Sequence, residues 1–269
     1  TATNIFNTTS VGVNFGQLSN IVISPSGATV AADKTLQLTA TGYDTMNNSQ
    51  DITHEVAWYV PNGTIENGLF SPYAVGEYTI YANRSGRSGH VTVMVNYGKL
   101  VRIIITPDNP SVDVLDTEPL KLKGTGYDIK NNLIINNWNW SISKGTIDPT
   151  GAEVTYTPKA PGKWIAMCSY GSIRANITID VTNTITISHN VTSTAATGGK
   201  VVISAVIVGY LDVMPTLYYK YHEEDIYQAT SMFNPEGDNY LGDIPGLIDP
   251  GSIFYYIVAS DGYNTAVTH

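Results

Sequence analysis

The sequence has one cysteine, few charged residues and no long apolar run. Cys168 has no second cysteine to pair with, so no disulfide can form within the chain. It lies in an alternating segment, 164–168, where a small buried apolar side chain is the expected role. Charged residues make up only 14% of the chain, and no run of apolar residues is long enough to span a bilayer. We therefore expect a disulfide-free protein with a surface of hydroxyl and amide groups, and no membrane insertion within this chain.

The charge balance excludes one large class of partners. The formal net charge is −9, and the pI is about 4.9. Nucleic-acid binding requires clustered lysine and arginine side chains that neutralise phosphates. The 14 basic residues are scattered along the chain. The sequence therefore predicts no nucleic-acid partner and no attraction to an anionic membrane surface.

Sequence motifs for catalysis and metal binding are also missing. The chain has no Gly-x-Ser-x-Gly, no glycine-rich phosphate loop and no His-Glu-x-x-His. The densest polar cluster, 222–225 (His-Glu-Glu-Asp), is interpreted as a solvated loop rather than a metal or acid–base site. Asp44 and Asp128 occupy equivalent places in a repeat, and Asx turns explain both without calcium. We expect no catalytic residue, metal or cofactor, and we expect that the protein is not an enzyme.

A long internal repeat organises the chain. IVISPSGATVAADKTLQLTATGYD, residues 21–44, returns as IIITPDNPSVDVLDTEPLKLKGTGYD, residues 103–128. Downstream, 58–60 (Trp-Tyr-Val) corresponds to 140–142 (Trp-Ser-Ile), and 76–78 (Gly-Glu-Tyr) to 162–164 (Gly-Lys-Trp). The offset of about 82 to 86 residues is close to the length of one small β-sandwich.

Alternation of apolar and polar residues predicts an all-β fold. Leu36, Leu38 and Ala40 alternate with polar residues, and no segment has helical periodicity. Trp58 is the expected core aromatic of the first repeat, and Asn62-Gly63 is a hairpin signal. We predict three tandem Ig-like β-sandwich domains with an N-terminal extended strand. The predicted boundaries are 1–18 for the extension, 19–98 and 99–183 for the two repeats, and 184–269 for a third domain.

The extension, 1–18, has an alternating apolar face. Its apolar residues are Ile5, Phe6, Val11, Val13 and Phe15. Three interpretations are open: a first strand packed on its own domain, a strand donated to a neighbouring subunit, or a disordered tail. Donation would assign these five residues to an inter-subunit strand.

The two repeats resemble the bacterial and archaeal Ig-like domains found in tandem on cell-surface proteins. The Ile-Ser/Thr-Pro opening, the Thr-Gly-Tyr-Asp block and residues 74–79 (Ala-Val-Gly-Glu-Tyr-Thr) carry this resemblance. The third domain looks like an Ig-like or fibronectin-III-like module, on the basis of residues 249–251 and 255–264. The resemblance implies an extracellular location at the cell surface. Such modules serve as spacers, adhesins, envelope building blocks and enzyme appendages.

N-glycosylation sequons are spread along the chain. Seven asparagines precede any residue except proline and then serine or threonine: Asn7, Asn47, Asn62, Asn83, Asn139, Asn176 and Asn190. Asn47, Asn62 and Asn83 are expected in turns. Asn139 is expected to point away from Trp138 and Trp140 on a strand. Glycans at these positions would keep a weakly charged surface soluble.

Together these features predict an extracellular structural glycoprotein that self-associates into a surface filament, such as a pilus, or a surface layer, without a cofactor. Strand donation by the extension is the expected assembly mechanism. One alternative is an adhesive or carbohydrate-binding module that uses tyrosines 218, 219, 221, 255 and 256. Another is a non-catalytic arm of a larger secreted enzyme.

Overall fold

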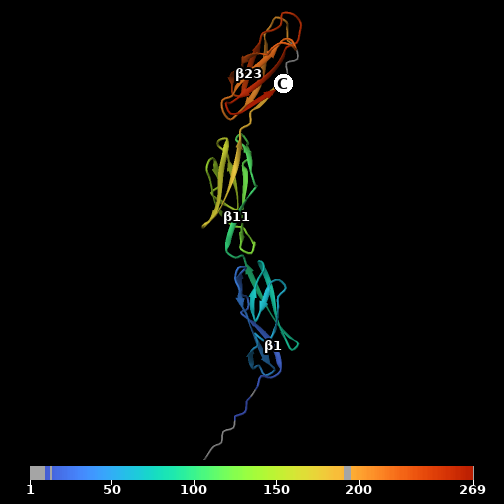
Figure 1. Ribbon diagram of the computed structural model, residues 1–269, viewed down its shortest axis with the longest axis vertical. Coiled ribbons are helices and arrows are strands. Elements are labelled where there is room, and N and C mark those ends of the chain that lie inside the picture. The colour runs from blue at the N-terminus through green and yellow to red at the C-terminus, as the bar shows by residue number, and fades with distance from the viewer. Residues whose placement is uncertain (1–9, 13, 191–194, 269) are drawn as a thin grey trace, which may run out of the picture. The chain divides into compact units, whose positions relative to one another are not determined.

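The computed structural model describes residues 10–12, 14–190 and 195–268. This described part consists of strands and connecting loops, without a helix (Figure 1). Every sheet is built from strands of one segment, 18–96, 100–182 or 186–268. The chain is therefore all-β and built of tandem Ig-like sandwiches, as predicted.

By compactness the chain divides into two units. The first comprises residues 1–104, 124–137 and 169–175, and the second comprises residues 105–123, 138–168 and 176–269. The division passes through the second repeat, so the predicted boundaries of three domains stay a prediction. Among the described residues, no helix is long and apolar enough to cross a bilayer.

The first repeat contains ten strands in three sheets. The strands are β1 (Leu18–Ser24), β2 (Thr29–Ala31), β3 (Leu36–Gln37), β4 (Thr39–Asp44), β5 (Ser49–Asp51), β6 (Ala57–Tyr59), β7 (Thr64–Glu66), β8 (Leu69–Ser71), β9 (Gly76–Arg84) and β10 (Arg87–Asn96). The sheet orders are β1-β4-β5, β2-β10-β9-β6 and β3-β8-β7. The chain thus passes from one sheet to another between β1 and β2.

Period-two burial explains the core of the first repeat. Along β10, Val91, Val93 and Val95 are buried while the residues between them are exposed. These valines pack in one cluster with Ile21 and Ile23 of β1. Because β-branched side chains pack well on a pleated surface, the pattern fixes both the strand and its register.

The second repeat has the same plan. Its strands are β11 (Leu100–Thr106), β12 (Ser111–Asp113), β13 (Leu120–Asp128), β14 (Leu133–Ile134), β15 (Trp138–Ile142), β16 (Thr146–Ile147), β17 (Thr150–Gly151), β18 (Glu153–Thr157), β19 (Gly162–Tyr170) and β20 (Ile173–Thr182). The orders are β11-β13-β18-β16, with β14 also on β13, and β12-β20-β19-β15-β17. Strands β1 and β11 have the same length and the same burial pattern, so the sequence repeat is also a structural repeat.

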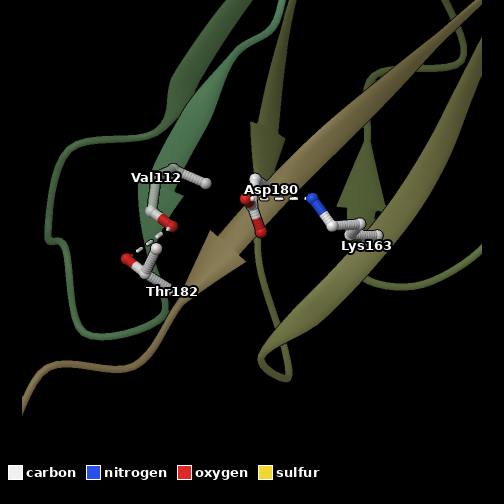
Figure 2. A network of polar contacts seen from close by, with 4 residues as sticks. All are labelled: Val112, Lys163, Asp180 and Thr182. Carbon is white, nitrogen blue, oxygen red and sulfur yellow. Dashed lines mark hydrogen bonds and ion pairs between the residues drawn. The ribbon is translucent and has the colours of Figure 1, made fainter.

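Polar contacts bridge neighbouring strands of this second repeat (Figure 2). Lys163 Nζ on β19 lies 3.2 Å from Asp180 Oδ2 on β20. The hydroxyl of Thr182 donates to the carbonyl of Val112 at 3.5 Å, where β12 pairs with β20. Solvent-exposed ion pairs contribute little, so burial of the strands supplies most of the stability here.

The third segment is a two-sheet sandwich. Its strands are β21 (Thr186–His189), β22 (Val201–Val208), β23 (Met214–Lys220), β24 (Gln228–Ser231), β25 (Phe233–Glu236), β26 (Asn239–Ile244), β27 (Phe254–Ser260) and β28 (Thr265–Thr268). The orders are β21-β22-β26-β25 and β24-β23-β27-β28. Ile203 and Ile207 on β22 pack in one cluster with Leu217 and Ile257 of the other sheet.

Three local expectations are wrong. Phe70, with no exposed surface, is the central core aromatic of the first repeat, whereas Trp58 is partly buried and packs against the core. Asn62-Gly63 does not close a hairpin, because β6 pairs with β9 while β7 pairs with β8. Asn83 lies on β9 rather than in a turn.

Candidate functional site

Asp44 organises the turn that follows β4. Its Oδ1 accepts backbone N–H groups from Met46 and Asn48, both at 2.9 Å. Its Oδ2 accepts the side-chain amide of Asn48 and the backbone N–H of Gly16, both at 3.0 Å. Asn47, at the tip, has φ of 66°, a conformation that asparagine tolerates better than most residues. This turn is the predicted Asx turn, with an additional bond to the incoming chain.

Asp128 makes the same set of bonds after β13. Its Oδ1 accepts from the backbone N–H of Lys130 and Asn132, and its Oδ2 accepts from the side chain of Asn132. Gly98 donates its backbone N–H to Asp128 Oδ2 at 2.7 Å. Asn131 repeats the positive φ of Asn47, at 66°. We call each of these arrangements a clamp. It consists of the aspartate of the Gly-Tyr-Asp block, the asparagine four residues later and the glycine that precedes the sandwich.

The third sandwich has a variant of the clamp. Asp261 accepts the backbone N–H groups of Tyr263 and Asn264 on Oδ1. Its Oδ2 accepts the side-chain amide of Asn183, which replaces the glycine of the other two clamps. Asn264 donates its side-chain amide to the carbonyl of Asn183 at 2.7 Å. The connector is therefore again fixed to the end of the sandwich that follows it.

The hydrogen bonds hold these carboxylates ionised. The side-chain bond from Asn48, followed by the backbone N–H groups of Gly16, Asn48 and Met46, lowers the pKa of Asp44 to about 2. Burial opposes ionisation of Asp128, but the side chain of Asn132 and three backbone N–H groups outweigh it and lower its pKa. Bonds from the backbone N–H groups of Asn264 and Tyr263 lower the pKa of Asp261. Carboxylates with such partners act as structural acceptors rather than proton donors.

The clamp at Asp128 also contacts residues before Gly98. The backbone N–H of Val75, in the loop before β9, donates to Asn132 Oδ1 at 3.1 Å. Asn132 is buried, with 8% of its surface exposed. Val75, Gly98, Asp128 and Asn132 all belong to the first compact unit. Asn132 therefore bonds to Asp128 through its amide N–H and to Val75 through its carbonyl.

The predicted glycosylation sites are accessible wherever the structure describes them. Asn47, Asn62, Asn83, Asn139, Asn176 and Asn190 are all exposed, and Asn7 lies outside the described residues. Asn139 lies between buried Trp138 and Trp140 on β15, so its side chain points to the other face, as predicted. Exposure permits modification, and occupancy stays a prediction.

The predicted inter-subunit residues are only partly described. Ile5, Phe6 and Val13 lie outside the described residues. Val11 is 85% exposed and Phe15 is partly buried. The described residues between 10 and 17 form no strand, and β1 begins at Leu18. Strand donation therefore stays a prediction.

The other candidate residues do not converge on a reactive site. In the loop after β23, His222 and Asp225 bond to each other in an exposed turn, with Asp225 Oδ2 accepting the backbone N–H of His222. Cys168 is buried, and burial raises its pKa to about 12, so its thiol is protonated. Within the described residues, no group of three or more His, Cys, Asp or Glu side chains is placed to hold a metal ion.

The tyrosines of the third sandwich divide between two faces, as strand alternation predicts. Tyr219 is buried, and Tyr221 and Tyr255 pack against the core. Tyr218 and Tyr256 lie on the opposite face, with their rings stacked at 4.9 Å. Tyr227 meets Tyr256 edge-on at 4.8 Å. Only part of the predicted tyrosine set can therefore meet a ligand.

The sequence-based predictions missed four residues of the first two clamps: Gly16, Asn48, Gly98 and Asn132. A signal for them was present. The segment Val-Asn-Phe-Gly-Gln-Leu at 13–18 returns as Val-Asn-Tyr-Gly-Lys-Leu at 95–100. Asn48 and Asn132 each lie four residues after the Gly-Tyr-Asp block.

No family model matches the chain. Ice-binding protein 1 of Shewanella frigidimarina (strain NCIMB 400) is 26% identical over 177 residues, which cover 62% of this chain. The chain spans 20% of the length of that protein.

Solved structures of tandem-domain proteins also match. Domains 4 and 5 of the S-layer protein SbsC are 16% identical with a TM-score of 0.33, covering 62% of this chain and 99% of that one. The I9–I11 tandem of titin is 13% identical with a TM-score of 0.32, covering 92% of this chain and 97% of that one. No functional conclusion follows from similarity at this level.

Proposed function

We propose that this chain is a structural part of an extracellular surface protein and carries no catalytic activity. The observation that supports this most is the repeated clamp. A connector of only three residues, 97–99, separates β10 from β11, and its glycine is held by a buried aspartate of the next sandwich. A connector this short, without a glycine- and serine-rich stretch, is stiffer than a flexible linker. That property is useful to a spacer or envelope building block.

Glycosylation is part of this proposal. Every described sequon asparagine is exposed, although these asparagines lie on strands as well as in turns. Glycans there would supply hydration that a surface with only 14% charged residues lacks. Mass mapping of the protein from its natural source tests this. Unmodified asparagine at all seven positions would contradict it.

Self-association into a filament or layer is the finer form of the proposal. Purified chain examined by light scattering and negative-stain electron microscopy should form ordered assemblies as concentration rises. A chain starting at Gln17 tests the predicted strand donation, because it lacks all five apolar residues of the extension. If the shortened chain assembles equally well, strand donation is wrong, while the structural role itself still stands.

An adhesive function is the second candidate, and one surface favours it. The stacked rings of Tyr218 and Tyr256, with Tyr227 beside them, offer flat apolar faces on the outer side of β23 and β27. Lys220 Nζ lies 4.9 Å from the centre of the Tyr227 ring, which adds a hydrogen-bond donor at the edge. Aromatic faces of this kind stack on sugar rings. A glycan array with the native chain and with Tyr218→Ala tests it; equal binding by both chains would exclude this surface.

A further inference from the structure

The residues before the first sandwich match the last strand of that same sandwich. Residues 11–18 read Val-Gly-Val-Asn-Phe-Gly-Gln-Leu, and residues 93–100 read Val-Met-Val-Asn-Tyr-Gly-Lys-Leu, about 82 positions later. The identical positions include Val11 with Val93 and Gly16 with Gly98. This register is the one that relates the two repeats. The leading segment therefore corresponds in sequence to the end of a repeat, not to its beginning.

In the first repeat, residues 93–96 of this stretch are the end of strand β10. Val93 and Val95 lie on β10 and expose 0% and 2% of their surface. Residues 94–96 of β10 pair in parallel with Thr29–Ala31 of β2, and β10 pairs in antiparallel with β9. Val11, the counterpart of Val93, is 85% exposed. The valine at this position is therefore buried in the core as Val93, whereas as Val11 it packs on no sheet among the described residues.

The hydrogen bonds after this stretch are the same in both copies. Gly16 donates to Asp44 Oδ2 at 3.0 Å, and Gly98 donates to Asp128 Oδ2 at 2.7 Å. A Cβ on Gly16 would lie 3.0 Å from Asp44 Oδ2, so a side chain there would crowd the acceptor. The aspartate, asparagine and glycine of the first clamp therefore make the same contacts as those of the second.

The two clamps differ in one hydrogen bond. The side-chain oxygen of the asparagine has a donor in the second clamp but none among the described residues in the first. Asn132 Oδ1 accepts the N–H of Val75, and Asn132 is buried. Asn48 makes the same bond to its aspartate, but it is exposed, and no described residue donates to its Oδ1. Among the described residues, the side-chain oxygen of Asn48 therefore lacks the donor that Val75 supplies to Asn132.

We propose that residues 11–14, the counterparts of residues 93–96 of β10, are the end of the last strand of a further sandwich of the same repeat type, which directly precedes the first one in the polypeptide. That sandwich rests on the turn 44–48, and a backbone N–H of its loop before the β9-equivalent strand donates to Asn48 Oδ1. The proposal depends on the repeat register and the clamp, not on the proposed surface function. Under this proposal the strand pairs within its own chain and is not donated to a neighbouring subunit.

A chimeric chain tests whether residues 11–16 can complete such a sandwich. In the chimera a copy of residues 16–91 replaces residues 1–9, so that residues 10–16 take the place of residues 92–98 in the added copy. In the matched control a copy of residues 16–98 replaces residues 1–16, which gives a chain of the same length. We expect the amide of Val11 to exchange roughly 100-fold more slowly than in the unextended chain, because it then exchanges only when a sheet opens. Val11→Asp in the chimera should abolish this protection and leave that of Val93 unchanged.

Two results would overturn the proposal. One is a control that folds while the chimera leaves Val11 unprotected. The other is an unextended chain that self-associates and loses this association when residues 10–16 are removed, since another subunit would then take up the strand.

The coding sequence upstream of Thr1 gives an independent test. It should encode a Gly-Tyr-Asp block whose aspartate precedes Gly16 by the same number of residues that separate Asp44 from Gly98. An unrelated sequence there would also overturn the proposal.

Discussion

The backbone N–H of Gly98 donates to Oδ2 of Asp128, 30 residues away, at 2.7 Å. This bond joins the connector after one repeat to the end of a strand in the next. The same oxygen accepts the side chain of Asn132, and the other oxygen accepts two backbone N–H groups. One carboxylate therefore fixes a turn and a connector together.

Replacing Asp128 with alanine should destabilise the protein. Four donors would lose a buried ionised acceptor, and leaving a single buried donor unsatisfied costs about 1–3 kcal/mol. We expect a loss in the free energy of unfolding of at least this size, measured by urea denaturation. Asp180→Ala is the control, because its exposed ion pair with Lys163 should contribute less than about 1 kcal/mol. Equal losses in both variants would contradict a special role for the clamp.

Stability should fall in acid through the clamps. The folded-state pKa values of Asp44, Asp128 and Asp261 are lowered, to about 2 for Asp44. A lowered pKa stabilises the folded state above the ordinary value of 3.8, and this contribution is lost as the pH falls from 3.8 toward 2. Thermal unfolding between pH 6 and 2 measures it. The Asp44→Asn variant should show a shallower decline than the native chain, and an identical decline would exclude Asp44 as a contributor.

Cys168 should be unreactive while the protein is folded. Burial raises its pKa to about 12, so the thiolate that attacks alkylating reagents is almost absent at neutral pH. Iodoacetamide should label the chain slowly in buffer and rapidly in urea, as followed by intact mass. Cys168→Ser provides the unlabelled control. Rapid labelling of the folded chain would show that the strand β19 opens readily.

Trp138 should be among the costliest residues to truncate in the second repeat. It exposes 0% of its surface on β15, and replacement of a buried tryptophan by alanine costs about 3–5 kcal/mol. Lys121→Ala on β13 of the same repeat changes an exposed residue and should alter stability by less than about 0.5 kcal/mol. Denaturation curves of the two variants compare them directly. A small effect of Trp138→Ala would mean that the core around it can collapse.

Alternation and internal repetition were enough to predict the sandwich fold. Val91, Val93 and Val95 point inward because a strand has a period of two, and this can be read from sequence. The placement of Trp58 could not be predicted in this way, because Phe70 on another strand fills the centre of the core and leaves Trp58 at its margin. The Asn62-Gly63 turn was misread because a two-residue signal does not specify which sheet the next strand joins.

The turns of the clamps could be predicted from the sequence, but their bonds to the glycines could not. The Asx turns at Asp44 and Asp128 follow from side-chain chemistry within a few residues. Their bonds to Gly16 and Gly98 join positions about 30 residues apart, so local patterns do not reveal them. Comparison of residues 13–18 with 95–100 would have indicated their common role, because a glycine recurs at the same position of both copies.

The central claim is that this chain serves as structure at the cell surface. Immunogold electron microscopy of intact cells of the natural source, with antibody raised against the purified chain, tests it most directly. The account predicts dense labelling along a continuous layer or along filaments outside the cell. Labelling confined to the cell interior, or release of the protein as dispersed monomers, would contradict it.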